Sequence, residues 1–194
     1  MAVLLAAGAG RRMGGPKALL RIGGESFLAH GAKTLARPGV ARVVAVLGHH
    51  AARVAAEAGA PPGVALTENP RYEVGMLSSI LRGIDEAERL AADAVLLHPV
   101  DHPLVDPATV DRVVAALEQG AVIAVPTHDG RRGHPGGFAR AAWAALRAAP
   151  AGRGARAVLA DHPAWVVHVP GDARCVVGID TPADYERWIG GVSP

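Results

Sequence analysis

The segment that decides the fold is a glycine-rich stretch near the N-terminus, Leu4-Leu5-Ala6-Ala7-Gly8-Ala9-Gly10-Arg11-Arg12-Met13-Gly14-Gly15-Pro16-Lys17. It begins inside an apolar run, residues 3–7, that is typical of a buried strand. The glycines that follow let the backbone curl close to a ligand and point N–H groups at it. Arg12 and Lys17 add cations that can form charge-assisted hydrogen bonds with phosphate oxygens. The segment therefore predicts a phosphate-binding loop at the end of a strand.

Two well-known phosphate-binding loops do not fit this segment. A Walker loop needs Gly-Lys-Ser/Thr, whereas Pro16-Lys17-Ala18 stands here. A dinucleotide-binding loop needs a third glycine where Met13 stands, and an acidic residue after the second strand. The second strand ends instead in Leu47-Gly48-His49-His50. These departures disfavour a dinucleotide-dependent oxidoreductase.

Apolar runs alternate with helical patterns along the first two thirds of the chain. Five runs predict buried strands, at residues 3–7, 42–47, 64–67, 94–97 and 121–125. Four patterns predict helices, at residues 26–36, 50–58, 77–90 and 107–117, the last with Asp106 as N-cap and Pro107 at its first position. This alternation predicts an α/β fold: a single three-layer αβα Rossmann-like domain, residues 1–194, with a mostly parallel central sheet.

The last third of the chain departs from this rhythm. A turn-rich piece at residues 133–138 leads into a short strand, and helices at 139–147 and 154–160 follow. Strands are expected near residues 165–168 and 175–178, and a final helix begins at Pro182, with Thr181 and Asp184 spaced as a capping box. Three tryptophans, Trp143, Trp165 and Trp188, are expected to be buried or half-buried and not to stack on bases.

Composition and charge exclude several classes of protein. The chain of 194 residues is half apolar but only 4% aromatic, so its core must be mainly aliphatic. Its formal net charge is +2 and its basic residues are scattered, which argues against a nucleic-acid partner. Cys175 is the only cysteine, so no intramolecular disulfide can form. With no signal peptide and no apolar run of about 18 residues, we expect a cytoplasmic protein without a membrane segment.

The loop ending in Pro16-Lys17 resembles the signature loop of the nucleotidyltransferases with a Rossmann-like, glycosyltransferase-A-like fold. These enzymes join a nucleoside triphosphate to a phosphorylated acceptor and release pyrophosphate. One branch, the molybdenum cofactor cytidylyltransferases, is similar in four further places as well: residues 69–80 (Asn-Pro-Arg-Tyr-Glu-Val-Gly-Met-Leu-Ser-Ser-Ile), Val100-Asp101-His102-Pro103, Gly133-His134-Pro135 and Ile179-Asp180-Thr181-Pro182. The resemblance covers nearly the whole chain, and Ala7-Gly8 stands where related guanylyltransferases usually carry Gly-Gly.

The resemblance implies transfer of CMP from CTP to the phosphate of molybdopterin, with Mg²⁺ as cofactor. It implies that Lys17, Arg12 and Asp101 are catalytic, and that Asp101 and Asp180 hold the metal. A molybdenum hydroxylase or its chaperone is implied as a protein partner. Acceptor contacts are expected from His134, Pro135 and Arg132. Nucleotide contacts are expected from Ala6, Ala7, Gly8, Gly10, Lys17, Gly48, Asn69, Gly75, Met76, Ser78 and Ser79.

The residues themselves allow plainer interpretations of some of these positions. Asp101 follows a buried strand, where a carboxylate can hold Mg²⁺ against phosphate oxygens. Asp180 precedes a helix start, where an acid is favourable for structural reasons alone. Ser78 and Ser79 open a helix and fit N-capping as well as ligand contact. A zinc site at His98, Asp101 and His102 is disfavoured, because Pro99 prevents a helical pair and the sequence places no third histidine or cysteine there.

Four departures from the branch pattern keep the acceptor and the base open. Val100 replaces a small or polar residue, and His102 stands where Gln or Met is common. Gly136-Gly137 replaces bulky apolar residues, and the first acid of the Asp-x-Asp tail is missing at Gly178. Two alternatives therefore stand. One is a transferase of the same fold that uses GTP or another acceptor of sugar, polyol or phospholactate type. The other is a non-catalytic nucleotide-binding assembly factor for a molybdenum hydroxylase.

Overall fold

One twisted sheet runs through the computed structural model, which describes residues 1–190; the last four residues of the predicted 1–194 domain lie outside it. The strand order is β10-β7-β9-β6-β1-β4-β5, and β8 pairs with β7. Within the described residues, only β8 and β9 run antiparallel to their neighbours in this sheet. The strands are β1 (Ala2–Ala6), β4 (Val43–Leu47), β5 (Ala65–Glu68), β6 (Ala94–Pro99), β7 (Ile123–His128), β8 (Arg131–Arg132), β9 (Gly136–Ala139) and β10 (Val166–Pro170), while β2 (Arg21–Ile22) and β3 (Glu25–Ser26) form a separate pair.

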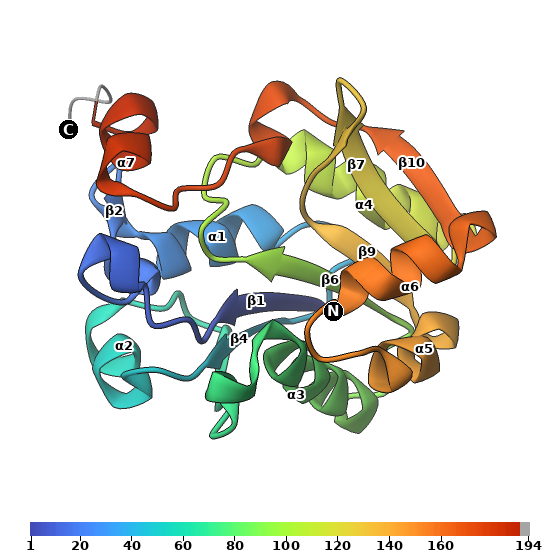
Figure 1. The fold of residues 1–194 in the computed structure, drawn as a ribbon, viewed down its shortest axis with the longest axis horizontal. Helices are drawn as coiled ribbons and strands as arrows, with labels where there is room; N and C mark the ends of the chain where they lie inside the picture. Colours follow the sequence, from blue (N-terminus) through green and yellow to red (C-terminus); the bar gives the residue numbers. More distant parts are fainter. Residues whose placement is uncertain (191–194) are drawn as a thin grey trace.

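Helices cover both faces of this sheet. One face carries α1 (Phe27–Leu35), α2 (Ala51–Glu57) and α4 (Pro107–Glu118), and the other carries α3 (Met76–Arg89), α5 (Trp143–Ala148) and α6 (Ala155–Asp161). Figure 1 shows α3, α5 and α6 on the near side, α1 and α4 behind the sheet, and α7 (Pro182–Trp188) at one end. The predicted α/β fold with a mostly parallel, helix-covered sheet is confirmed.

The first strand shows why both faces must be covered. All five of its residues are buried, and because side chains alternate along a strand, they enter two separate cores. Ala2, Leu4 and Ala6 pack with α1 and α4 on one face. Val3 and Leu5 pack with α3 on the other face. An uninterrupted apolar run without polar alternation is therefore the pattern of a central parallel strand.

Most predicted elements lie where the patterns put them. The five expected strands are β1, β4, β5, β6 and β7, and the four expected helices are α1 to α4, with ends that differ by up to three residues. Asp106 accepts a hydrogen bond from Ala108 N as the N-cap of α4, and Thr181 with Asp184 forms the capping box of α7. The turn-rich piece at 133–138 does lead into a strand, β9. Local capping residues and hydrophobic periodicity were therefore enough to predict these elements from the sequence.

Three expectations about burial and strand content are wrong. The strand expected near residues 175–178 is a 3₁₀ turn over Ala173–Val176, which Asp172 caps by accepting from Cys175 N. The expected buried strand at 64–67 is the edge strand β5, whose Leu66 is 38% exposed because β5 has a partner on one side alone. Trp188 is exposed, since α7 lies at the end of the molecule. Burial at a sheet edge depends on strand order, which periodicity does not encode.

The strand order creates a switch point between β1 and β6. From β1 the chain proceeds outward through β4 and β5, then returns to the other side of β1 as β6. Connections to left and right of this point diverge, which leaves a crevice beyond the carboxyl ends of the two strands. The glycine-rich loop follows β1 there, and Asp101 follows β6. None of the described helices is both long and apolar enough to cross a membrane.

A close approach between α3 and β1 gives the first prediction. A Cβ at Gly83 would lie 2.5 Å from Val3 Cγ1 in the buried core, too close for any real contact. We expect Gly83→Ala to lower the free energy of unfolding by about 1–3 kcal/mol through overpacking. Gly31, which faces Leu4 from α1 at 3.3 Å, is the matched control. There the gain in helix propensity of about 1 kcal/mol should offset the smaller strain. Urea unfolding measures both, and equal effects would contradict the packing argument.

Candidate active site

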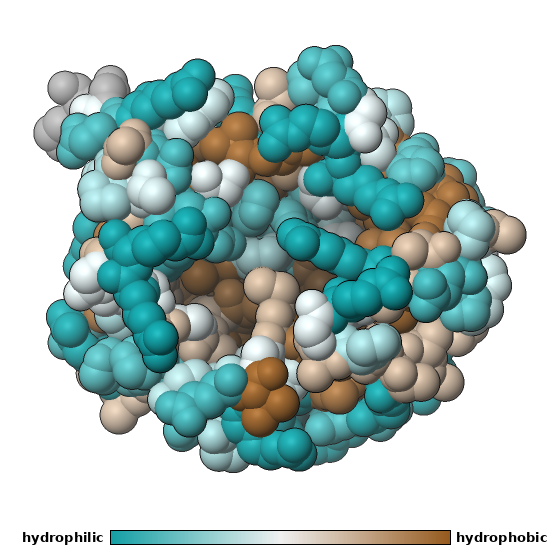
Figure 2. Space-filling view, viewed as in Figure 1, coloured by the Kyte–Doolittle hydropathy of each residue, from teal (hydrophilic) through white to brown (hydrophobic). Residues whose placement is uncertain are grey.

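A cleft of about 820 Å³ lies beyond the carboxyl ends of β1 and β6. This volume is within the range of small-molecule sites. Figure 2 shows this side of the molecule hollowed next to the end of β1, with hydrophilic residues around a more apolar floor. Ten of the residues predicted from the sequence line the cleft together: Ala7, Gly8, Gly10, Arg12, Lys17, Gly75, Met76, Ser79, Asp101 and Asp180.

The glycine-rich loop forms one wall of this cleft. Its chain turns back on itself at Gly10, whose carbonyl accepts hydrogen bonds from Met13 N at 2.8 Å and Gly15 N at 3.3 Å. Gly10 has φ +60°, and a Cβ there would lie 1.8 Å from the Gly15 carbonyl oxygen. The turn sends the chain through a short 3₁₀ helix, Arg11–Met13, and then to Lys17. Glycine is thus required at position 10 for the loop to return Lys17 to the cleft.

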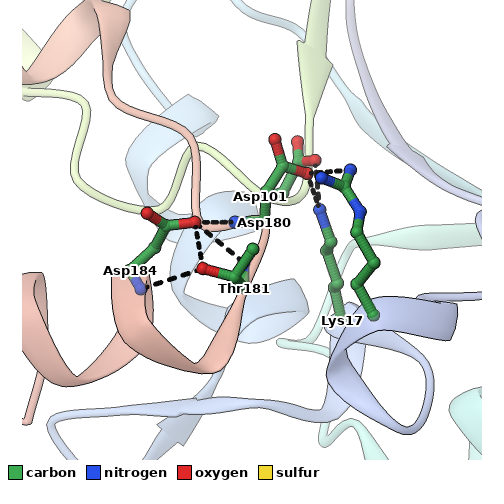
Figure 3. Close-up of polar contacts among 6 residues, drawn as sticks. Lys17, Asp101, Asp180, Thr181 and Asp184 are labelled. Atoms are coloured by element: carbon green, nitrogen blue, oxygen red, sulfur yellow. Dashed lines mark hydrogen bonds and ion pairs between the residues drawn. The ribbon is translucent and has the colours of Figure 1, made fainter.

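Lys17 bridges two aspartates that are far apart in the sequence (Figure 3). Its Nζ donates to Asp101 Oδ2 at 2.8 Å and to Asp180 Oδ1 at 2.6 Å. Arg12 donates to the same Asp180 Oδ1 at 3.1 Å, but its side chain is 68% exposed against 14% for Lys17. The buried ammonium, and not the exposed guanidinium, therefore holds the two carboxylates together.

Backbone contacts fix the second aspartate beside the first. The amide of Ile179, which is fully buried, donates to the carbonyl of Asp101 at 2.8 Å. The carboxylate of Asp184 then accepts from the amides of Asp180 and Thr181, at 3.1 and 2.8 Å, as part of the capping box (Figure 3). The start of α7 thus serves as an anchor that presents the Asp180 side chain to the cleft.

The charges in this cluster support one another. Burial strips water from the Lys17 ammonium and by itself lowers its pKa, but the hydrogen bonds and charges of Asp101 and Asp180 outweigh that and raise the pKa. The hydrogen bond from Lys17 in turn lowers the pKa of Asp180. The Lys17 ammonium and the Asp180 carboxylate consequently both remain ionised around neutral pH.

Two carboxylate oxygens that face one point suit a hard divalent cation. Mg²⁺ is commonly held by one or two carboxylates together with substrate phosphates. Across residues 1–190, no group of three or more His, Cys, Asp or Glu side chains is arranged to hold a metal ion. Asp101 and Asp180 therefore fit a metal that takes its remaining ligands from phosphate or water.

Asn69, Ser78 and Ser79 form a hydrogen-bonded cluster, the Asn69 cluster, at the cleft wall. The Asn69 amide donates to Ser78 Oγ at 2.8 Å and Ser79 Oγ at 2.9 Å, and Ser78 donates to the carbonyl of Gly75 at 2.7 Å. The N-capping interpretation of the serines is wrong, because α3 begins at Met76 with Gly75 as N-cap and no side chain caps it. The Asn69 cluster instead fixes the loop before α3, so that Gly75 and Met76 face the cleft.

Several predicted residues do not reach the cleft wall. Gly48 is buried behind it, and a Cβ there would lie 2.6 Å from Tyr72 Cβ and 2.8 Å from Ala7 Cβ. Arg132 is exposed on the hairpin strand β8. The cleft lining also omits the predicted residues Ala6, Asn69, Ser78, His134 and Pro135. Three of them lie against wall residues from behind: Gly48 against Ala7, Asn69 against Ser79 and Ser78 against Gly75.

Three histidines meet next to the aspartates, which the sequence did not indicate. His102 and His134 have ring centroids 4.4 Å apart, and His98 lies 6.4 Å from His134. The Nδ1 atoms of all three are buried without a hydrogen-bond partner among the residues that the structure describes. Burial lowers the pKa of His98 to about 3 and that of His134 well below its usual value, and it also lowers that of His102. The imidazoles are therefore neutral at pH 7.

The cleft also includes residues that sequence reasoning missed. His49, Tyr72 and Glu73 line it, and the His49 ring nitrogen lies 3.3 Å from the Tyr72 hydroxyl. The place of His49 directly after β4 was a usable signal, because strand carboxyl ends border such a crevice. Tyr72 and Glu73 fall inside the segment 69–80 that resembles the family, although neither was predicted as a site residue; they sit in a 3₁₀ turn before α3.

A model of the MobA-like NTP transferase domain matches residues 2–166 of the chain. The chain belongs to this family. The match includes the glycine-rich loop and Asp101 but ends before Asp180, so the family assignment rests on the first of the two carboxylates. Membership makes the chain a nucleotidyltransferase-type protein and leaves nucleotide and acceptor open.

Two curated relatives show how varied the matching proteins are. The nicotine blue oxidoreductase of Paenarthrobacter nicotinovorans is 38% identical over 140 residues, 69% of this chain and 67% of that protein. A 2-C-methyl-D-erythritol 4-phosphate cytidylyltransferase of Cereibacter sphaeroides is 37% identical over 135 residues, 66% of this chain and 59% of that enzyme. Other matching relatives are bifunctional enzymes, of which the chain spans 28–37%.

Solved structures agree with the family over almost the full length. A nucleotidyl transferase from Methanothermobacter has a TM-score of 0.82 at 25% identity and covers 97% of this chain and 95% of its own. A Mycobacterium tuberculosis protein solved as a complex with manganese has a TM-score of 0.70 at 26% identity, covering 98% of both chains. The fold and the nucleotidyltransferase class are thereby supported by whole-chain likeness.

The loop geometry predicts that position 10 tolerates only glycine. Alanine at Gly10 would adopt a strained left-handed backbone and meet a carbonyl oxygen, so we expect Gly10→Ala to lower the free energy of unfolding by at least about 2 kcal/mol. Gly8→Ala is the control, because Gly8 is in open space and needs no positive φ. Chemical denaturation of both variants tests this, and a tolerated alanine at position 10 would contradict the loop geometry.

The buried histidines predict a loss of stability on mild acidification. In the unfolded chain a histidine binds a proton below about pH 6.5, whereas folded His98 does not until about pH 3. Stability therefore falls as pH decreases through this window, by up to about 1.4 kcal/mol per pH unit for each such histidine. We expect His98→Leu to flatten the dependence of the unfolding free energy on pH between 6.5 and 4.

The control for this measurement is His168→Leu, since His168 is exposed on β10. That variant should keep the wild-type slope. An unchanged slope in His98→Leu would show that His98 does not stay neutral in the folded protein.

Proposed function

We propose that this protein transfers CMP from CTP, with a divalent metal, to the phosphate of molybdopterin, releasing pyrophosphate. The observation that carries the proposal is the convergence of the glycine-rich loop, Lys17, Asp101 and Asp180 at the switch point of the sheet. Family membership supports nucleotidyl transfer. The CTP and molybdopterin assignments go beyond it and rest on the sequence resemblance.

The cleft suits a triphosphate in shape and charge. Loop residues Gly8 to Arg12 line one side, where backbone N–H groups can approach phosphate oxygens closely. Lys17 and Arg12 are the nearest cations to the two carboxylates, and both line the cleft. Because Lys17 is mostly buried, its charge is screened less than that of an exposed side chain.

Nucleotidyl transfer asks the protein mainly for positioning and charge stabilisation. When bound, Mg²⁺ would neutralise phosphate charge, held by Asp101 and Asp180. Lys17 and Arg12 stabilise negative charge that develops on the triphosphate. The acceptor phosphate is already ionised near neutral pH, so no side chain is required as a general base. The neutral histidines are consistent with this, since none of the three has to give or take a proton.

The nucleotide's base is expected on the side of α3. That part of the cleft is lined by Ala7, Gly75, Met76 and Ser79, and the Asn69 cluster holds the loop before α3 in place. Ala7 favours CTP over GTP as the substrate, because the related guanylyltransferases usually have a glycine at the position of Ala7. Its Cβ packs toward Gly48 and fills space that a glycine would leave open.

The acceptor is proposed to lie toward the histidine cluster. His134 is held there by its amide, which donates to the Cys175 carbonyl at 2.9 Å. In this proposal His134 and Pro135 shape the acceptor end. Arg132 contributes only if β8 turns toward a bound acceptor. A molybdenum hydroxylase or its chaperone would then receive the product.

A polyol phosphate is the best second candidate for the acceptor. The relative from Cereibacter sphaeroides is named for transfer of a cytidylyl group to 2-C-methyl-D-erythritol 4-phosphate. A cleft that positions CTP and a metal is equally compatible with that acceptor. The same assay must therefore include it.

The relative from Paenarthrobacter nicotinovorans is named an oxidoreductase, so oxidoreduction is a further candidate activity. The proposal favours transfer because the loop of this chain lacks the third glycine of a dinucleotide site and the cleft instead holds two carboxylates around a lysine. Hydride transfer to a dinucleotide has no need of that arrangement. A non-catalytic binding protein would have no need of it either.

The decisive test is an assay of pyrophosphate release. The protein is incubated with Mg²⁺, one nucleoside triphosphate at a time, and either molybdopterin or 2-C-methyl-D-erythritol 4-phosphate. We expect release with CTP and molybdopterin alone. Release only with GTP, or only with the polyol phosphate, would refute the proposed specificity. No release with any pair would favour the binding protein.

Asp101→Asn tests the metal role within the same assay. A metal ligand supports several kcal/mol of transition-state stabilisation, so activity should fall about 100-fold or more. Asp85→Asn is the matched control, because Asp85 pairs with Arg147 on the surface far from the cleft. Substantial activity in Asp101→Asn would place the metal elsewhere.

A further inference from the structure

The position of the Lys17 ammonium raises a question about the order in which ligands enter the cleft. Nζ lies 2.8 Å from Asp101 Oδ2 and 2.6 Å from Asp180 Oδ1, so it occupies the one point that both carboxylates face. That point is also where a divalent cation would have to be held by the same two oxygens. Both cations cannot share it, because their repulsion at such a separation is strong and largely unscreened in a partly buried site.

We propose that Lys17 is a placeholder for the metal: in the nucleotide-free protein its ammonium neutralises Asp101 and Asp180, and it leaves them only when a triphosphate gives it other anionic oxygens. The metal then enters together with the nucleotide. The idea rests on the proposed nucleotidyl transfer but concerns one step of it, the coupling between triphosphate and metal binding.

Burial supports this exchange. The Lys17 side chain is 14% exposed, and those of Asp101 and Asp180 are 26% and 46% exposed. Two carboxylates so close together would repel each other without a cation between them. The lysine thus stabilises the empty site, and any metal that enters alone must first displace it at the cost of leaving a partly buried ammonium without a partner.

The small number of metal ligands that the protein offers supports the proposal independently. Within residues 1–190, no set of three or more acidic, histidine or cysteine side chains can hold a metal. The protein therefore offers two carboxylates, and Mg²⁺ or Mn²⁺ needs further oxygens. A triphosphate supplies the further oxygen ligands for the metal and also the anionic partners that Lys17 needs once it leaves the carboxylates. Lys17 lines the same cleft as Gly8 and Gly10, so phosphates held by that loop would share the cleft with its side chain.

Metal binding without nucleotide tests the proposal. Mn²⁺ is titrated into wild-type protein, Lys17→Met and the double variant Lys17→Met/Asp101→Asn, and bound metal is measured by electron paramagnetic resonance. We expect wild type to bind Mn²⁺ at least 10-fold more weakly than Lys17→Met. The double variant should lose the gain, which assigns it to the carboxylate pair.

The control is Lys33→Met, which removes a lysine from a surface ion pair with Glu25. It should bind Mn²⁺ like wild type. Equal Mn²⁺ affinity in wild type and Lys17→Met would overturn the proposal. If Lys17→Met does not fold, wild type alone decides. Mn²⁺ binding that is as tight without nucleotide as with a nucleoside triphosphate, and that Asp101→Asn abolishes, would overturn the proposal. Mn²⁺ binding at least 10-fold tighter with the triphosphate would support it.

These results do not depend on the identity of base or acceptor, because neither is present in the titration. A wrong assignment of CTP or molybdopterin would appear in the pyrophosphate assay and leave the metal titration unchanged. Conversely, a protein that transfers CMP but binds Mn²⁺ equally with and without Lys17 would retain the proposed function and lose the placeholder.

Discussion

The site depends on one backbone hydrogen bond, from the amide of Ile179 to the carbonyl of Asp101. It joins the segment before the last helix to the end of the sixth strand, two regions that are far apart in the chain. Asp180 follows immediately and comes within reach of Lys17, and the capping box of α7 holds the connection in place. This contact brings the two carboxylates to the same place, where Lys17 bridges them.

The rest of the cleft follows from strand order. Placing β6 next to β1 brings the loop after each strand to the same edge, so the glycine-rich loop and Asp101 face each other. The continuous burial of β1 on both faces holds this edge rigid, because α3 and α1 pack closely on its two sides. The loops are thereby carried on a packed frame, and such loops are where binding and catalytic residues commonly lie.

Charge balance links the frame to chemistry. A partly buried lysine between two aspartates is stable in the absence of ligand, yet its partners suit a divalent metal and its own charge suits phosphate. The same residues therefore serve two arrangements. The neutral histidines beside them are the other unusual feature, since burial keeps them uncharged next to a strongly charged cluster. An ionic cluster in the cleft thus lies beside a group of uncharged histidines that does not line it.

The sequence alone determined the α/β class, most of the elements, and the place of the glycine-rich loop, Lys17 and Asp101 after their strands, because these depend on periodicity, capping and glycine placement within short stretches. It also pointed to Asp180 and the Asn69 segment, though only through family resemblance. Tertiary structure decided the rest: that β5 is a half-exposed edge, that residues 173–176 form a turn, and that His98, His102 and His134 meet. These features arise from strand order and from contacts between distant segments, which no local pattern records.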